Sequence, residues 1–126
     1  MRELLKAKIK RLDTAAEYFF DEGCYINELS NDADDSEASI ARARVRPGDV
    51  TRWHRLIGIT ERYVILKGSG CVEIGNLAPE NVGPGDVVII PPECRQRISN
   101  TGKDDLVFIA VCTPRFRQDA YEDIET

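Results

Sequence analysis

The segment GDVTRWHRLIGITERYVILKG, residues 48–68, decides the fold of this chain. It opens at Gly48, directly after a proline, and this pairing suits a type II turn that needs positive φ at its third residue. It closes at Gly68, after a run rich in β-branched residues that is typical of a strand. Between the two glycines lie His54, which is the chain's one histidine, and Glu61. The segment therefore predicts short strands, bounded by tight turns, that carry polar groups suited to a site.

Strand-like runs continue on both sides of this segment. They are EYFFDEGCYINEL (17–29), IARARVR (40–46), CVEIG (71–75), DVVIIP (86–91) and LVFIAVC (106–112). The first consists of two runs separated by Asp21, Glu22 and Gly23, which predicts a hairpin. Short strands with Pro/Gly turns favour a sandwich or closed barrel. The repeated PGDV at 47–50 and 84–87 fits a jelly roll built from two Greek keys.

The two ends of the chain differ from this strand-rich middle. Residues 1–17 predict an N-terminal arm or a short helix, because the leucines and isoleucine of RELLKAKIKRL approximate one helical face, and both alternatives stay open. Residues 18–114 form the predicted barrel, interrupted by an acidic solvated loop at 30–39. Residues 115–126 predict a polar C-terminal tail that packs on a neighbour.

Composition excludes several classes of function. The chain has 126 residues, the length of one domain, and 17 Lys+Arg against 22 Asp+Glu, a net charge of -5. A chain with this net charge lacks the overall positive potential that attracts the phosphate backbone, so we expect no nucleic-acid partner. No apolar run approaches the roughly 18 residues that span a bilayer, and no signal peptide is evident, so we expect a cytoplasmic protein without a membrane partner. The four cysteines form no CxxC pair, which indicates reduced thiols.

Two glycine-framed segments resemble the signature motifs of the cupin superfamily. In the first, Gly48, His54, Glu61 and Gly68 stand in register, and Leu56 replaces the second histidine. The resemblance, which spans about residues 40–112, implies an all-β double-stranded β-helix, a jelly-roll barrel with one pocket.

In the second motif Gly85, Pro91 and Asn100 match. Glu93 stands at the motif's later glycine and Gln96 at its histidine. The short connection between the two motifs, residues 69–84, is typical of small single-domain cupins.

The resemblance also implies a site of three histidines and one glutamate that holds a divalent Fe, Mn, Ni or Zn ion. Carried over residue by residue, the ligands are His54, Glu61 and the amide oxygen of Gln96. A neutral amide is a weaker ligand than imidazole, so we expect this metal to be weakly held or absent. A cysteine, Cys94 or Cys112, replacing a missing ligand is a further alternative. Another is that His54 and Glu61 are a hydrogen-bonded remnant inside a ligand pocket.

Three residues are candidates for binding a ligand: Tyr63, Gln96 and Arg44. Alternation along a strand gives Tyr63 the same direction as Glu61, so its ring either stacks on a flat ligand or packs in the core. The guanidinium groups of IARARVR share one strand face and would attract an anionic ligand, unless that face is solvated or forms an interface.

These observations support two classes of function. The first is an isomerase, or another enzyme of proton transfer, acting on a carbonyl or sugar-acid substrate, with Glu61 as general base and His54 as acid or metal ligand. The competing class is a non-enzymatic ligand-binding or sensing module, and a metal-dependent dioxygenase is a second alternative. We also predict a homodimer, because jelly-roll edges leave backbone groups unpaired.

Overall fold

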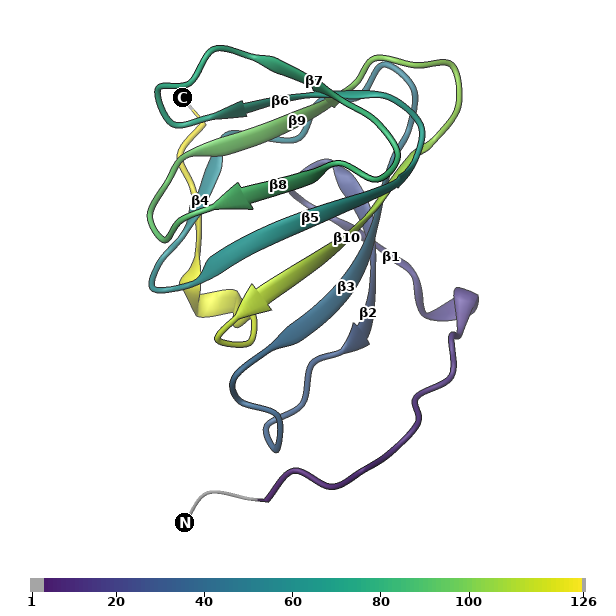
Figure 1. Ribbon diagram of the computed structural model, residues 1–126, viewed down its shortest axis with the longest axis vertical. Coiled ribbons are helices and arrows are strands. Elements are labelled where there is room, and N and C mark those ends of the chain that lie inside the picture. The colour runs from purple at the N-terminus through teal and green to yellow at the C-terminus, as the bar shows by residue number, and fades with distance from the viewer. Residues whose placement is uncertain (1–3, 126) are drawn as a thin grey trace.

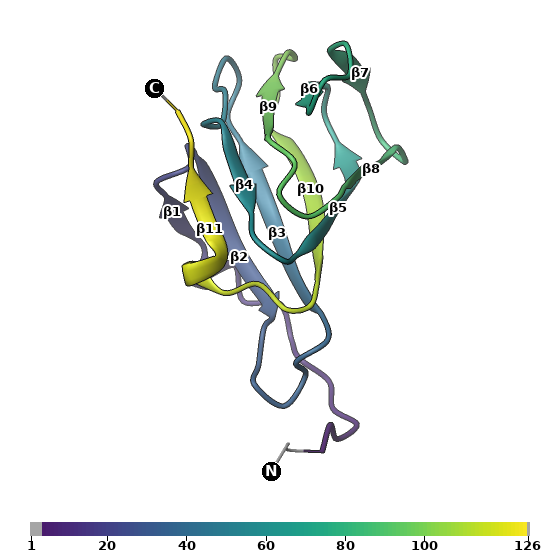
Figure 2. The same ribbon diagram turned by 90° about the vertical axis from the view of Figure 1, so that its left-hand side faces the viewer.

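The computed structural model describes residues 4–125, and within them almost all regular structure is β (Figure 1). Two antiparallel sheets face each other, as Figure 2 shows from the side. The first sheet has the order β1 (Tyr18–Phe20), β2 (Cys24–Ser30), β3 (Ser39–Val45), β10 (Leu106–Thr113), β5 (Thr60–Lys67), β8 (Val87–Ile90). The second has the order β11 (Tyr121–Asp123), β4 (His54–Leu56), β9 (Gln96–Asn100), β6 (Gly70–Ile74), β7 (Glu80–Val82). The predicted jelly roll is confirmed, although hydrogen bonds do not close the two sheets into one barrel.

The space between the sheets is filled by side chains that alternate along the strands. The central strands β5 and β10 contribute Ile65, Leu106 and Phe108, each at most 2% exposed. Val45 of β3 and Ile98 of β9 complete this packing from the two sheets. Burial of such side chains stabilises each by about 1.5–3 kcal/mol, so these strands form a rigid frame for the residues beside them.

Glycines make the turns that the sequence predicts. Gly48 and Gly85 have φ of 82° and 89°, in the left-handed region that glycine adopts most readily. Gly68 has φ of 90° and directly follows β5. A Cβ at Gly68 would lie 2.7 Å from the carbonyl oxygen of Asp105, so this position also needs glycine for a close backbone approach.

The predicted hairpin is present. Strands β1 and β2 pair antiparallel, with Tyr18 opposite Ile26, and the turn between them is closed by a hydrogen bond from the Gly23 N–H to the Phe20 carbonyl oxygen, 2.9 Å long. The hairpin extends the first sheet beyond β3 and holds the turn residue Glu22 at the edge of the space between the sheets.

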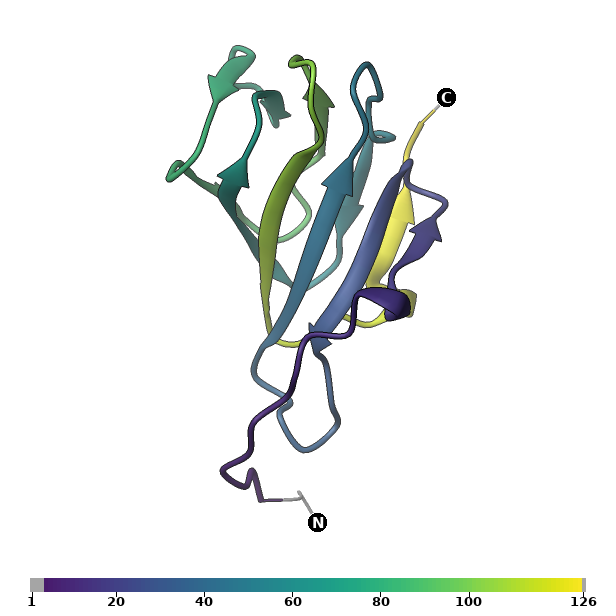
Figure 3. The ribbon, with the colours of Figure 1, turned by 90° about the vertical axis from the view of Figure 1, so that its right-hand side faces the viewer.

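At the N-terminus the arm, and not the helix, is present among the described residues. Residues 4–13 have no regular secondary structure, and a 3-10 turn follows at Thr14–Ala16. The arm projects from the barrel (Figure 3), and Lys8 binds Asp34 of the acidic loop at 2.7 Å. An isolated helix this short is marginal in water, which agrees with the absence of a helix in residues 4–13. None of the helical turns within residues 4–125 is long enough to cross a bilayer.

The C-terminal residues, predicted as a polar tail that packs on a neighbour, include a strand that packs on the barrel of their own chain. A 3-10 turn at Gln118–Ala120 leads into β11, which pairs antiparallel with β4 of the same chain. Leu56, Cys112 and Ala120 are buried together in a small second core at this end of the barrel. The segment therefore completes the second sheet and becomes part of the pocket wall.

Candidate functional site

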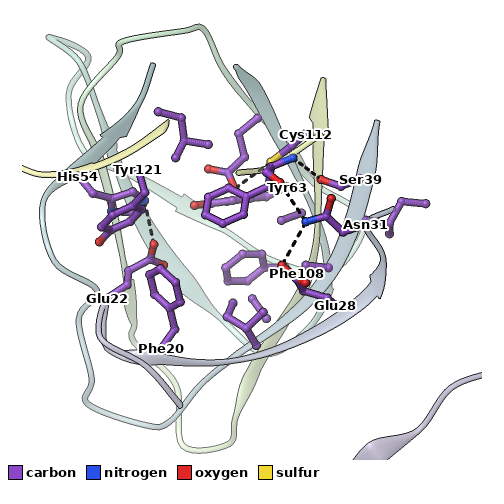
Figure 4. A pocket seen from close by; sticks show the side chains of 18 of the residues that line it. Phe20, Glu22, Glu28, Asn31, Ser39, His54, Tyr63, Phe108, Cys112 and Tyr121 are labelled. Carbon is purple, nitrogen blue, oxygen red and sulfur yellow. Dashed lines mark hydrogen bonds and ion pairs between the residues drawn. The ribbon is translucent and has the colours of Figure 1, made fainter. Parts of the chain in front are cut away.

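One pocket opens between the two sheets, on the side where the β1–β2 hairpin faces β11 (Figure 4). It encloses about 620 Å³ including the part open to solvent, and the centres of water molecules can occupy about 60 Å³ of it. Small-molecule sites are commonly about 300–1,000 Å³, so the roughly 60 Å³ open to water centres suits only a small ligand or one part of a ligand. His54 and Glu61, the two residues that the motifs place in a site, both line it.

His54 is held rigidly at the start of β4. The residue is 1% exposed, and its ring stacks on Tyr121, with centroids 5.2 Å apart and planes 20° apart. Its Nδ1 lies 2.6 Å from the carbonyl oxygen of Arg52, which can only accept, so Nδ1 carries a hydrogen. Its Nε2 lies 3.2 Å from Oε1 of Glu22. This contact is an ion pair when the imidazole is protonated.

Glu61 brings a carboxyl group into the pocket from the start of β5. Its Oε1 is shielded from solvent and makes no hydrogen bond within the described chain, although other parts of the residue are partly exposed. The thiol of Cys112 donates to Oε2 at 3.7 Å. Burial, and then the negative charge of Glu22, raise the pKa of Glu61 to about 7, while His54 and Gln96 offset part of the rise. Glu61 can thus accept or release a proton near neutral pH.

Tyr63 and Gln96 form a buried pair beside this carboxyl group. The Tyr63 hydroxyl donates to Oε1 of Gln96 at 2.6 Å, and the Tyr63 ring packs on Phe108 with centroids 4.3 Å apart. Tyr63 lines the pocket. Gln96 is 1% exposed, and its Nε2 has no hydrogen-bond partner in the described residues.

These residues do not fit the metal site that the resemblance implies. Nε2 of His54 faces Glu22, and the buried side chain of Leu56 stands where a second imidazole would be. The amide oxygen of Gln96 is already occupied by the Tyr63 hydroxyl. Within residues 4–125 no group of three or more His, Cys, Asp and Glu side chains is arranged to hold a metal ion. The donor set falls short of a stable divalent site.

Arg44 does not reach the pocket, contrary to its assignment as a ligand-binding residue. It donates to Glu17 at 2.6 Å and to Asp105 at 3.2 Å, and its guanidinium group lies over the Tyr25 ring at 4.3 Å from the centroid. Alternation along β3 explains this placement, because Ala43 lines the pocket and its neighbour must point outward. Arg44 therefore lies on the outer face of the sheet, where its ion pairs bury part of the side chain.

Several pocket residues were not identified from the sequence. Glu22 lies in a hairpin turn, where an acidic residue normally indicates only solvent exposure. Phe20 of β1 and Tyr121 of β11 meet edge to face across the seam between the sheets, with centroids 5.1 Å apart. Tyr121 reaches the pocket wall because β11 pairs with β4, and no local sequence pattern predicts that pairing.

Two curated archaeal proteins resemble this chain. A glucose-6-phosphate isomerase from Thermococcus onnurineus is 28% identical over 84% of this chain and 69% of its own length. The uncharacterized protein MJ1618 from Methanocaldococcus jannaschii is 30% identical over 90% of this chain and 91% of its own length.

Solved structures show the same fold at lower identity. The nucleoside dehydratase Pac13 from Streptomyces superposes with a TM-score of 0.76 at 15% identity, covering 94% of this chain and 92% of that chain. Oxalate decarboxylase from Bacillus subtilis superposes with a TM-score of 0.78 at 16% identity, covering 97% of this chain and 34% of that chain. Residues 41–112 match the Cupin domain family. This chain belongs to the cupin domain family.

Proposed function

We propose that this protein is a cupin-type enzyme that transfers a proton on a small carbonyl compound, as in an isomerisation. The observation that supports this most is the Glu61 carboxyl group, which lies in the pocket with one oxygen unpaired and a pKa raised to about 7. A base whose pKa lies near the working pH combines a useful ionised fraction with good proton-accepting strength.

In this mechanism the Glu61 carboxylate takes the proton from the carbon next to the carbonyl group. The electron pair of the broken C–H bond forms a C=C bond, and the carbonyl oxygen becomes the oxygen of an enol. His54, whose Nε2 faces Glu22 at the pocket wall, is the acid of this proposal, and its protonated form supplies a proton to that oxygen. Glu61 then returns its proton to the former carbonyl carbon, while the hydroxyl group on the other carbon gives its proton back to His54, which leaves the isomer and restores both groups.

The comparisons support this class of reaction in a general way. One relative carries the name of an isomerase, and structural neighbours include a dehydratase and a decarboxylase. A dioxygenase is not supported, because the donor set described above does not fit a firmly bound iron. The apolar residue Leu56 in the wall favours the alternative of a ligand-binding module without catalysis.

The experiment is proton exchange with solvent. Wild-type protein is incubated in D₂O with unphosphorylated aldoses, ketoses and amino sugars, and NMR measures deuterium entering the carbon next to the carbonyl group. We expect exchange that falls about 10²- to 10⁴-fold in Glu61→Gln, the usual contribution of a general base. Glu80→Gln, an exposed position on β7, is the matched control and should exchange as wild type. Ligand binding without exchange would contradict catalysis and support the binding module.

A further inference from the structure

Apart from His54, the charged side chains that line the pocket are all carboxylic acids. Glu22, Glu28 and Glu61 line it, and no lysine or arginine does so among the described residues. Glu22 is engaged with His54, whereas Glu61 has one unpaired oxygen and Glu28, at the exposed rim, contacts the Asn31 amide at 3.3 Å. An anionic ligand would therefore meet these carboxyl groups, while the one imidazole of the wall, His54, is engaged with Glu22.

The remaining wall is rich in aromatic rings. Six of them line the pocket: Tyr18, Phe20, Tyr63, Phe108, Phe116 and Tyr121. Figure 4 shows several of these rings gathered around the space between Glu22 and Tyr63. The face of an aromatic ring attracts a cation within about 6 Å, and the attraction strengthens when the site excludes water.

We infer that the pocket takes a small ligand that carries an ammonium group on an apolar or carbonyl-bearing body, and that it rejects phosphates and carboxylates. The inference deepens the proposed function and rests on it for the statement that this pocket is the functional site. It replaces the anionic ligand expected from Arg44, which binds Glu17 and Asp105 outside the pocket. It also separates this chain from a relative whose named substrate is a sugar phosphate.

Glu61 makes this preference depend on pH. Glu22, His54, Gln96 and Cys112 all act on the pKa of Glu61. The Cys24 thiol and the Tyr63 hydroxyl also lie close enough to interact with its charge, and burial raises the pKa of both, so they stay protonated. The Cys112 thiol stays protonated because burial raises its pKa. As pH rises through the pKa of Glu61, about 7, the pocket gains a negative charge. Cation binding should therefore be weaker at pH 6 than at pH 8.

The test compares three probes of similar shape and different charge: benzylamine, benzyl alcohol and benzoate. Calorimetry or NMR titration at pH 8 should show benzylamine binding at least about tenfold tighter than benzyl alcohol, a difference of about 1.4 kcal/mol, and no binding of benzoate. The benzylamine preference should shrink at pH 6. It should also shrink in Glu61→Gln at pH 8, and remain in the Glu80→Gln control.

Three results would overturn the inference: benzoate binding as tightly as benzylamine, no benzylamine binding at millimolar concentration, or a preference unchanged in folded Glu61→Gln. Glu28→Gln provides a second variant at the rim if Glu61→Gln does not fold. These measurements need no turnover. Charge preference without deuterium exchange therefore contradicts only the proposed catalysis, and exchange without charge preference contradicts only the ligand class.

Discussion

Replacing Glu61 with glutamine should change how stability depends on pH. The folded protein holds this carboxyl group at a pKa of about 7, above the ordinary value of 4.5 that it regains on unfolding. Between these two values the folded state binds the proton more tightly than the unfolded state does. The stabilisation from Glu61 is therefore fully present below pH 4.5 and is lost as pH rises toward 7. Glutamine has no proton to lose, so the variant lacks this dependence.

The size of the effect follows from the two pKa values. At about 1.4 kcal/mol per pH unit, a rise from 4.5 to about 7 corresponds to roughly 3 kcal/mol of unfolding free energy. Some of this stabilisation has already been lost at pH 5. Between pH 5 and pH 8 the wild type should lose about 2.5 kcal/mol relative to Glu61→Gln. The unfolding free energy of the variant should therefore increase relative to that of the wild type as pH rises.

Urea denaturation of both proteins at pH 5, 6, 7 and 8 measures this difference, because titrations common to the two proteins cancel. Glu80→Gln serves as control, since its exposed carboxylate should give a difference from wild type that barely changes with pH. A Glu61→Gln difference that stays constant from pH 5 to pH 8 would refute the raised pKa. That result would also remove the main support for Glu61 as a general base.

Further predictions concern metal, fold and assembly. Protein purified without chelator or a nickel column should contain well below one metal ion per chain; a near-unit ratio that survives dialysis and disappears in His54→Ala would refute this. Leu56→His with Gln96→His should create a site that titrates with cobalt, since Gln96 pairs with His54 in register and Leu56 lines the same pocket; no gain in the folded double variant would contradict the motif alignment. Gly68→Ala should lower the unfolding free energy by at least about 1–3 kcal/mol in urea, because of its positive φ and the backbone of Asp105. Light scattering should give a homodimer, and a 14.2 kDa species at micromolar concentration would exclude it.

Local patterns in the sequence predicted the barrel well. Gly48, Gly68 and Gly85 occupy left-handed turns because only glycine does so cheaply, and this is a property of the residue itself. The hairpin and the strand runs followed in the same way from composition and alternation. The position of His54 and Glu61 in one pocket came from motif register combined with strand alternation.

The details of the site depend on tertiary contacts that sequence patterns do not encode. Glu22 contacts His54 because the hairpin of the first sheet lies close to β4 of the second sheet in the folded chain. Alternation predicted that Arg44 shares a face with its neighbouring arginines but could not tell which face is inside. The answer comes from Ala43, whose small side chain leaves space for the pocket. Strand β11 likewise depends on β4, a partner distant in sequence.

The seam closed by Phe20 and Tyr121 has a consequence for how pockets of this kind diversify. Both rings, and Glu22 between the first two strands, come from outside residues 41–112, the part that matches the family. The barrel frame and the chemistry of its inner wall can therefore stay constant while the two chain ends change the entrance. Proteins that share the central segment but differ at their termini should accept different ligands. Trimming this chain to its family-matching core would remove one wall of the pocket along with the ends.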